Sequence, residues 1–359
     1  MGIPSGARVG RRSVFLIALA AFAFLAAPVG RAAPVNAYVV TPLVSNVPGM
    51  APTVDSNLVN AWGLVAGPTS PWWVADNGMD VSTLYNAAGT KIPLTVTVDS
   101  APTGVVFNGD STNFLVAGPG TAARFIFSTE AGAILGWSPA TGPAAIVKAD
   151  SSDEGNVYKG LAYAITPTGP RLYATDFFNA RVEMYSGVWA DVDIPGSFHD
   201  PSIPAGYAPF GIQAIGSRIF VTYAKQSPEC CDELHGQGLG FVDAYDLDGT
   251  LLVGVAHRGQ LNAPWGLAMA PAGFGRFSGD LLVGNFADGH VNAYEEMANG
   301  HFVFRGFLLN PDGTPLAIDG LWALEFGNGA PNNGPVNTLF FTAGPNDESD
   351  GLFGTIMAA

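Results

Sequence analysis

The densest group of reactive side chains in this sequence lies in residues 229–235. The segment reads Glu-Cys-Cys-Asp-Glu-Leu-His, and thiols, carboxylates and an imidazole in such proximity can bind a transition metal. Neither CxxC nor HxxxH spacing is present to strengthen a metal site. Two other interpretations stay open. Cys230 and Cys231 form a vicinal disulfide that stiffens the segment, or the segment is a solvated loop with incidental cysteines.

Four polar residues recur at similar places, each after a short apolar run: Asp76, Glu130, Asp176 and Asn285. One interpretation is a ring of oxygen ligands for Ca²⁺ or another hard cation. The other is that each side chain caps its own turn through hydrogen bonds to nearby backbone groups. A position that recurs with a repeat is first explained by the repeat, so we favour turn capping.

Aromatic residues precede several glycines of a repeated phrase. Trp62, Phe210 and Trp265 either stack on flat ligands such as sugar rings or wedge neighbouring structural units together, and we favour the second interpretation. Lys159 is the one basic residue at an equivalent position, which makes it a candidate to face a ligand. The sequence holds no Gly-x-Ser-x-Gly elbow, His-Glu-x-x-His motif or phosphate-binding glycine loop. Three histidines belong to no recognisable constellation: His199, His257 and His301.

The phrase that positions these residues is a bulky residue, a glycine and an apolar run. Its glycines recur at intervals of 41 to 56 residues, and each phrase is followed by short β-branched and aromatic strands between Gly, Asp and Asn turns. Most units end in a fourth, variable strand. Six such units predict an all-β, six-bladed β-propeller. The phrases occupy residues 61–65, 102–106, 158–162, 209–213, 264–268 and, in looser form, 318–322.

Propeller geometry predicts which residues share a face. In each blade the first strand runs away from one face and the second strand returns to it, so the residues that enter the first strand lie beside the turn after the second. Asp319 and the loop 225–240 are expected on the same face. Function in such scaffolds usually lies in the loops. The predicted ligand-facing residues are Trp62, Asp76, Lys159, Asp176, Lys225, Trp265, Asn285 and Asp288.

Both ends of the chain carry predictions of their own. Residues 38–44 read as a strand that closes the ring inside the last blade, because an open sheet edge invites aggregation. Three arginines precede a small, apolar stretch at residues 14–27 that is too short to span a membrane comfortably. We therefore expect a signal peptide at residues 1–32, with cleavage as late as Ala37, followed by a single domain at 33–359. Export by the Sec or the twin-arginine route would place the protein in the periplasm or outside the cell.

The charge balance narrows the partners. Removing residues 1–32 leaves 11 basic and 30 acidic residues. Such a surface repels phosphate backbones and anionic lipid heads, so nucleic acid and membranes are poor partners, whereas cations are suitable ones. The two cysteines are adjacent and cannot link distant strands, so the fold depends on its apolar core. We expect a monomer.

The strand phrases bulky-x-Gly-apolar, Leu-Tyr/Phe-Val-Ala-Asp and Arg-Val-x-x-Tyr resemble the NHL-type propeller repeat. Together with residues 60–64, 73–78 and 240–243, they resemble a family of exported bacterial proteins of uncharacterised function, some of which carry a PEP-CTERM tail. The resemblance covers nearly all of the chain after the signal segment, and it implies fold and export rather than an activity. This chain ends in Ile-Met-Ala-Ala without Pro-Glu-Pro, so we expect release rather than anchoring.

Two classes of function remain. The first is an exported binding or interaction propeller that presents one loop-rich face to a protein, glycan or small molecule. The second is a hydrolase or lyase that depends on a divalent metal such as Ca²⁺, held by carboxylates at the propeller funnel. A structural envelope protein without a funnel is a third possibility. Stability in the presence of a chelator distinguishes the second class from the first.

Overall fold

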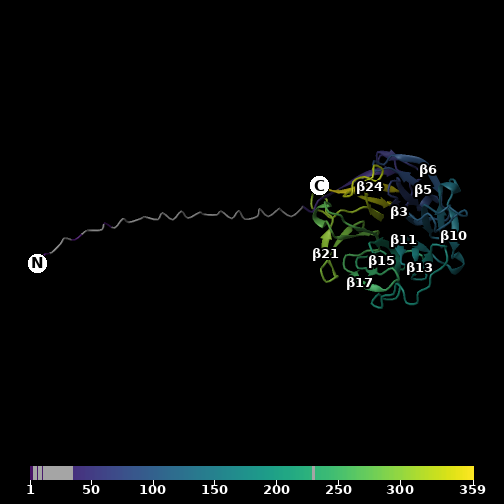
Figure 1. The fold of residues 1–359 in the computed structure, drawn as a ribbon. Coiled ribbons are helices and arrows are strands. Elements are labelled where there is room, and N and C mark those ends of the chain that lie inside the picture. Colours follow the sequence, from purple (N-terminus) through teal and green to yellow (C-terminus); the bar gives the residue numbers. More distant parts are fainter. Residues whose placement is uncertain (3–5, 7–9, 11–34, 229–230) are drawn as a thin grey trace. The chain divides into compact units, whose positions relative to one another are not determined.

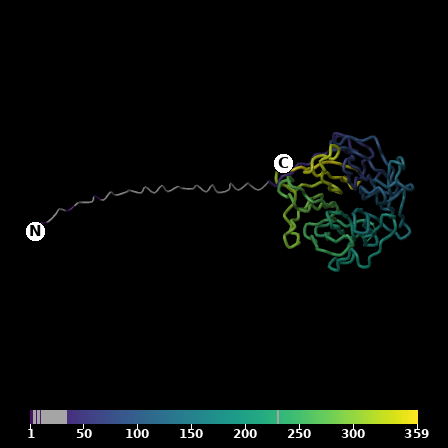
Figure 2. The backbone as a smooth tube through the Cα atoms, in the orientation of Figure 1, coloured from purple at the N-terminus to yellow at the C-terminus, as the bar shows by residue number. Residues whose placement is uncertain are grey.

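The structure is a computed structural model that describes residues 1, 2, 6, 10, 35–228 and 231–359. The chain divides into residues 1–33 and residues 34–359, and the second unit is a ring of six β-sheets (Figures 1 and 2). The predicted six-bladed β-propeller is confirmed. The predicted signal peptide falls mainly on residues outside the described part of the chain, so it stays a prediction.

Four of the six blades are antiparallel sheets of four strands in chain order, from the axis outward. Blade 1 consists of β3 (Ala61–Ala66), β4 (Trp72–Asp76), β5 (Val81–Tyr85) and β6 (Lys91–Thr97). Blade 2 consists of β7 (Pro102–Phe107), β8 (Phe125–Thr129), β9 (Ala133–Trp137) and β10 (Ile146–Asp150). Blade 4 consists of β14 (Tyr207–Ile215), β15 (Arg218–Lys225), β16 (Gly240–Tyr245) and β17 (Leu251–His257). Blade 5 consists of β18 (Pro264–Met269), β19 (Leu281–Asn285), β20 (Val291–Glu296) and β21 (Phe302–Phe307).

Blades 3 and 6 depart from this plan. Blade 3 has three strands, β11 (Tyr158–Thr166), β12 (Gly169–Asp176) and β13 (Arg181–Ser186), and the segment that follows meets β13 only at a bridge between Tyr185 and Asp191. Blade 6 consists of β22 (Leu321–Phe326), β23 (Leu339–Ala343) and β24 (Leu352–Ala358), completed by β1 (Tyr38–Ser45) and the short β2 (Thr53–Val54). Because β1 pairs antiparallel with β24, the predicted closure by the N-terminal strand is confirmed.

The glycines of the repeated phrase are required by the packing of the innermost strands. A Cβ at Gly63 would lie 2.5 Å from the backbone oxygen of Thr103 in the next blade, and a Cβ at Gly211 would lie 2.1 Å from that of Trp265. Contact between carbon and oxygen at these distances is strongly repulsive, so only glycine allows the blades to approach so closely.

The core lies mainly between facing blades, where aromatic and branched side chains interdigitate. Four short 3₁₀ helices occupy loops: η1 (Asn77–Met79), η2 (Pro139–Thr141), η3 (Ser152–Glu154) and η4 (Gly275–Phe277). Within the described residues, none of the helices has the length and apolar character that a membrane crossing needs.

Candidate functional site

A cavity of about 360 Å³ opens on the face where the sequence places the ligand-facing residues. Its walls come from five blades and from the loop between β15 and β16. They carry six carboxylates against one lysine and one histidine among the described residues. The lining residues are Trp62, Glu130, Lys159, Asp232, Glu233, His235, Phe286, Ala287, Asp319, Gly320, Gly344, Asp347 and Glu348.

The strand registers define a ring of six side chains around the axis. In each blade the innermost strand pairs with the second strand in a register that is interrupted once. In blades 1 to 5 this interruption falls at the residue that comes directly before the glycine of the repeated phrase. In blade 6 the interruption falls between Leu321 and Leu324. The predicted sixth phrase at 318–322 is therefore wrong, because the register aligns Trp322, and not Asp319, with the other ring residues. The ring consists of Trp62, Thr103, Lys159, Phe210, Trp265 and Trp322.

The aromatic members of the ring pack together beneath the cavity. Trp62 stacks on Trp322 with ring centroids 3.6 Å apart, and Phe286 stacks on the same indole at 4.0 Å. Trp265 stands edge-on to Trp62 and Trp322, and its Nε1 donates a hydrogen bond to the backbone oxygen of Lys159 at 2.9 Å. These contacts join blades 1, 3, 5 and 6, as the wedge interpretation predicts. Two of the rings, those of Trp62 and Phe286, also line the cavity.

Lys159 is buried beside the cavity, and its ammonium is held by carboxylates. Its side chain is 2% exposed, and Nζ lies 2.6 Å from Oε1 of Glu130 and 3.5 Å from Oδ1 of Asp232. The same Nζ lies 5.2 Å from the ring centroid of Trp62, within the range of a cation–π contact. Burial would lower the pKa of Lys159, but the nearby carboxylates, first Glu130 and then Glu233, outweigh it and raise the pKa.

The remaining walls hold two groups, Glu348 and His235, whose pKa values are raised by their surroundings. Burial, reinforced by repulsion from Glu233, raises the pKa of Glu348 to about 7. Nε2 of His235 lies 3.4 Å from Oε1 of Glu233, and this hydrogen bond raises the pKa of His235. His235 also packs edge-on against Phe286 at 5.5 Å. The cavity therefore changes its charge across the neutral range.

The four proposed metal ligands do not occupy equivalent positions. Asp76, Asp176 and Asn285 each pair with the residue of the innermost strand that comes just before the interruption in register. In blade 2 the residue that makes the corresponding pair is Thr129. The predicted equivalence of Glu130 is therefore wrong by one residue. Glu130 lies in the turn that follows β8, one residue beyond the position that corresponds to Asp76 and Asp176. Glu130 reaches the cavity, whereas Asp76, Asp176 and Asn285 are fully buried.

Asp76 and Asp176 accept hydrogen bonds from backbone N–H groups of their own hairpins, as turn capping predicts, whereas Asn285 does not. Oδ2 of Asp76 accepts a hydrogen bond from the backbone N–H of Thr83 at 2.9 Å. Asn285 donates through Nδ2 to the backbone oxygen of Gln260 and to Oδ1 of Asp288. Among the described residues, the only three His, Cys, Asp or Glu side chains with ligand atoms within 4.8 Å of one another lie elsewhere. Asp76, Glu130 and Asp176 thus do not converge on a cation.

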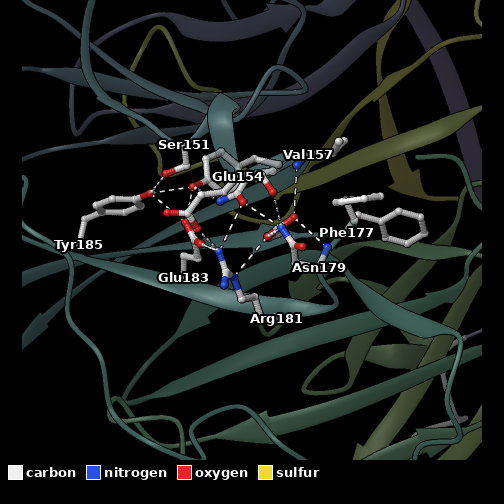
Figure 3. A network of polar contacts seen from close by, with 12 residues as sticks. Ser151, Glu154, Val157, Phe177, Asn179, Arg181, Glu183 and Tyr185 are labelled. Carbon is white, nitrogen blue, oxygen red and sulfur yellow. Dashed lines mark hydrogen bonds and ion pairs between the residues drawn. The ribbon is translucent and has the colours of Figure 1, made fainter. Parts of the chain in front are cut away.

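Asp176 belongs to a polar network at the edge of blade 3. Its Oδ1 accepts hydrogen bonds from the backbone N–H groups of Val157 and Asn179, both at 3.2 Å. Figure 3 shows Arg181 and Glu183 next to this turn, with an ion pair between them, and the hydroxyl of Tyr185 beside Glu183. Because both oxygens of Asp176 serve the turn and Arg181, the network is structural.

The other predicted site residues lie away from the cavity lining. Nζ of Lys225 lies 5.0 Å from the ring centroid of Tyr207. Asp288 accepts hydrogen bonds from the backbone N–H of His290 in its own loop and from Nδ2 of Asn262 in the segment before β18. Cys231 is disulfide-bonded. Cys230 lies outside the described residues, so the vicinal pairing stays a prediction. Sequence reasoning singled out Glu233 and His235 within residues 229–235 but missed Phe286 and Glu348, because loops from other blades bring them to the same cavity.

The fold and the charged cavity define a six-bladed β-propeller with an acidic mouth, by which we mean the cavity of about 360 Å³ and its lining residues. Two uncharacterized proteins of Acanthamoeba polyphaga mimivirus are similar to this chain in sequence. R648 is 33% identical over 346 residues, which cover 92% of this chain and 82% of the viral protein. L690 is 30% identical over 350 residues, which cover 92% and 88%. The chain therefore belongs to the family of these viral proteins. No family model matches it, and its resemblance to exported bacterial proteins stays a prediction.

Solved structures share the fold at low sequence identity. A glucose dehydrogenase crystal structure is similar with a TM-score of 0.53 and 13% identity, covering 89% of this chain and all of the other. A streptogramin B lyase structure is similar with a TM-score of 0.52 and 11% identity, covering 90% and 98%. Likeness at this level extends to the six-bladed architecture alone.

Proposed function

We propose that the protein is a binding propeller whose mouth takes a small organic cation. The excess of carboxylates in the cavity wall carries this proposal. Glu130 and Asp232 pair with Lys159, and the cavity still presents four other carboxylates against His235. The described carboxylates do not converge in threes on a point, so their arrangement suits an extended organic cation better than a directly bound metal ion.

The aromatic floor supports the same ligand class. An organic cation such as a quaternary ammonium is attracted to the face of an aromatic ring. Trp62 and Phe286 line the cavity, and Trp62 already lies near the ammonium of Lys159. A cavity of about 360 Å³ is within the size range of small-molecule sites.

Choline and its uncharged carbon isostere, 3,3-dimethylbutan-1-ol, provide a matched pair of probes. In isothermal titration calorimetry we expect choline to bind and the isostere not to bind. Raising the pH from 6 to 8 should strengthen choline binding, because Glu348 ionises about pH 7 and adds a negative charge. Binding should weaken in Glu233→Gln, whereas Glu296→Gln, whose side chain pairs with Arg218 outside the cavity, serves as the control. Equal binding of choline and its isostere, or binding of neither choline nor spermidine at millimolar concentration, would refute the proposal.

A second candidate function is acid–base catalysis in the same cavity. The observation that favours it is Glu348, whose pKa burial raises to about 7, because a group that titrates near the working pH can exchange protons with a substrate. The hydrogen-bonded pair of His235 and Glu233 lies in the same cavity wall. The similar streptogramin B lyase structure makes a lyase a reasonable class to assay. A metal-dependent version predicts a stoichiometric ion after purification and a lower melting temperature in EDTA, and elemental analysis with a chelator melt tests both.

We also propose export, on the basis of the basic and apolar residues at the start of the chain. Expression in a bacterial host, followed by cell fractionation and N-terminal sequencing, should recover a chain beginning at residue 33 or 38 outside the cytoplasm. Recovery of the intact chain from the cytoplasm alone would contradict export.

A further inference from the structure

A second group of potential ligands lies on the outer side of blade 4, away from the lining of the mouth. Nε2 of His257 lies 3.0 Å from Oδ1 of Asp243 and 3.8 Å from Oδ2 of Asp200. Asp243 is on β16, His257 ends β17, and Asp200 comes from the segment between β13 and β14. All three ligand atoms lie within 4.8 Å of one another, the one such group among the residues that the structure describes.

A bulge in blade 4 creates the space between these side chains. His257 pairs with Phe241 and Ala256 with Val242, but Asp243 pairs with Gly254, so Val255 is an extra residue. His257 and Asp243 are then diagonal neighbours on one face of the sheet. The position opposite Asp243 carries no side chain, and a Cβ there would lie 2.7 Å from Nε2 of His257. Glycine at 254 therefore keeps the centre of the group open.

Further hydrogen bonds fix the orientation of both carboxylates. The hydroxyl of Tyr245 donates to Oδ2 of Asp243 at 3.2 Å, and this hydroxyl is itself bonded to that of Tyr223 at 2.6 Å. The backbone N–H and the hydroxyl of Ser202 donate to the two oxygens of Asp200 at 2.7 and 2.8 Å. Oriented ligands with their own hydrogen-bond partners are a general feature of metal sites in proteins.

The burial and charge of the group call for a cation. The side chains of Asp243 and Asp200 are 0% and 6% exposed, whereas that of His257 is 37% exposed. Among the described residues, their ion-pair partner is His257, and neither pairs with a lysine or an arginine. The group thus places two buried carboxyl ligands beside one imidazole, without a lysine or arginine to compensate them among the described residues. Burying an uncompensated charge is costly.

We propose that Asp200, Asp243 and His257 form a binding site for a divalent transition metal ion of the zinc type. Bonds of about 2.1 Å to a tetrahedral Zn²⁺ place its ligand atoms roughly 3.4 Å apart, between the 3.0 and 3.8 Å separations of the group. Solvent reaches the ion from the side of His257 and fills the remaining coordination. The ion would fasten the segment that carries Asp200, which stands where blade 3 has no fourth strand, to blade 4.

The test is titration of the metal-free full chain with Zn²⁺ by calorimetry and with Co²⁺ by visible absorption. We expect one site per chain that requires His257, with at least about a 100-fold loss of affinity in His257→Gln and in Asp243→Asn, since even outer partners of a ligand are worth 10–100-fold. Gly254→Ala, which keeps all three ligands, should also weaken binding, because its Cβ enters the space between them.

Two controls separate this site from the rest of the molecule. His235→Gln removes the histidine of the mouth and His301→Gln removes an exposed histidine of a different blade, so both should bind Zn²⁺ and Co²⁺ as the unaltered chain does. Thermal melts of each metal-free variant establish that it is folded. Absence of Zn²⁺ and Co²⁺ binding, or binding that persists in folded His257→Gln, would overturn the proposal and leave an ion pair between His257 and Asp243.

Discussion

Replacing Lys159 or Glu130 alone should destabilise the protein far more than replacing the partners of an exposed ion pair. Lys159→Met removes a buried ammonium and leaves Glu130 among the other carboxylates of the mouth. Removing one partner of a buried pair costs about 3–5 kcal/mol. Because the side chain of Glu130 is 30% exposed and can recover part of its hydration, we expect about 3 kcal/mol for Lys159→Met.

The coupling free energy between Lys159 and Glu130 is a stricter measure of their interaction than the stability lost in either single variant. A hydrogen bond to a charged group contributes roughly 1.5–3 kcal/mol, and partial exposure of Glu130 places our expectation at about 2 kcal/mol. Arg218 and Glu296 form a more solvated comparison pair, joined by two hydrogen bonds of 2.8 and 2.7 Å, with side chains that are 25% and 34% exposed. For this control we expect a coupling energy of about 0.5 kcal/mol.

Urea unfolding of a double-mutant cycle measures both coupling energies. One cycle combines Lys159→Met with Glu130→Gln, and the other combines Arg218→Met with Glu296→Gln. Each cycle isolates the pairwise contribution because changes shared by the single variants cancel. A coupling energy for the first pair no greater than that of the control pair would refute the argument that burial strengthens it.

Three further predictions concern the titrating wall, the axial packing and the ring closure. The pKa of Glu348 is about 7 in the folded chain against an ordinary 4.5, so the stability it contributes is full below pH 4.5 and is lost as the pH rises through 7; the free energy of unfolding should fall more between pH 5 and 8 in the unaltered chain than in Glu348→Gln. Gly211→Ala should cost about 3 kcal/mol or more through its contact with the next blade, whereas Gly109→Ala, whose Cβ meets only a ring carbon at 3.6 Å, should stay within about 0.5 kcal/mol in chemical denaturation. Deleting residues 35–45 should expose β24 and cause concentration-dependent aggregation in light scattering, and a monomeric, cooperatively unfolding product would contradict this.

The repeat made the architecture predictable, because every blade packs against its neighbours through similar residues at equivalent positions. Gly63 and its equivalents are glycines because neighbouring blades approach closely there. Residues 38–44 were predicted to pair with the last blade because its edge would otherwise be open. Trp322 was within reach of sequence reasoning too. Leu-Trp-Ala-Leu at 321–324 matches Ala-Trp-Gly-Leu at 61–64, but the nearby glycine at 320 led to the wrong register.

The site was less predictable because its residues belong to loops and to local irregularities. Lys159 was found from its place in the repeat, whereas Glu348 and His235 depend on how two unrelated loops fold over the mouth. The prediction for Glu130 was wrong by one position in the register, and as a result a residue of the cavity wall was taken for a turn cap. His257 gave no sequence signal, since it meets Asp243 only through the pairing of β17 with β16, and the bulge at Val255 places Gly254 opposite Asp243.

The pairing of β1 with β24 also sets the order of events during synthesis. Tyr38 pairs with Ala358, so the first strand of the ring finds its partner only when nearly the whole chain has been made. At 5–20 residues per second this takes roughly 15–60 s, during which blades 1 to 5 can form while their ring stays open. The closing step is a contact of very large sequence separation, which is the slow kind in folding. A chaperone that shields one short strand could therefore hold the entire propeller open.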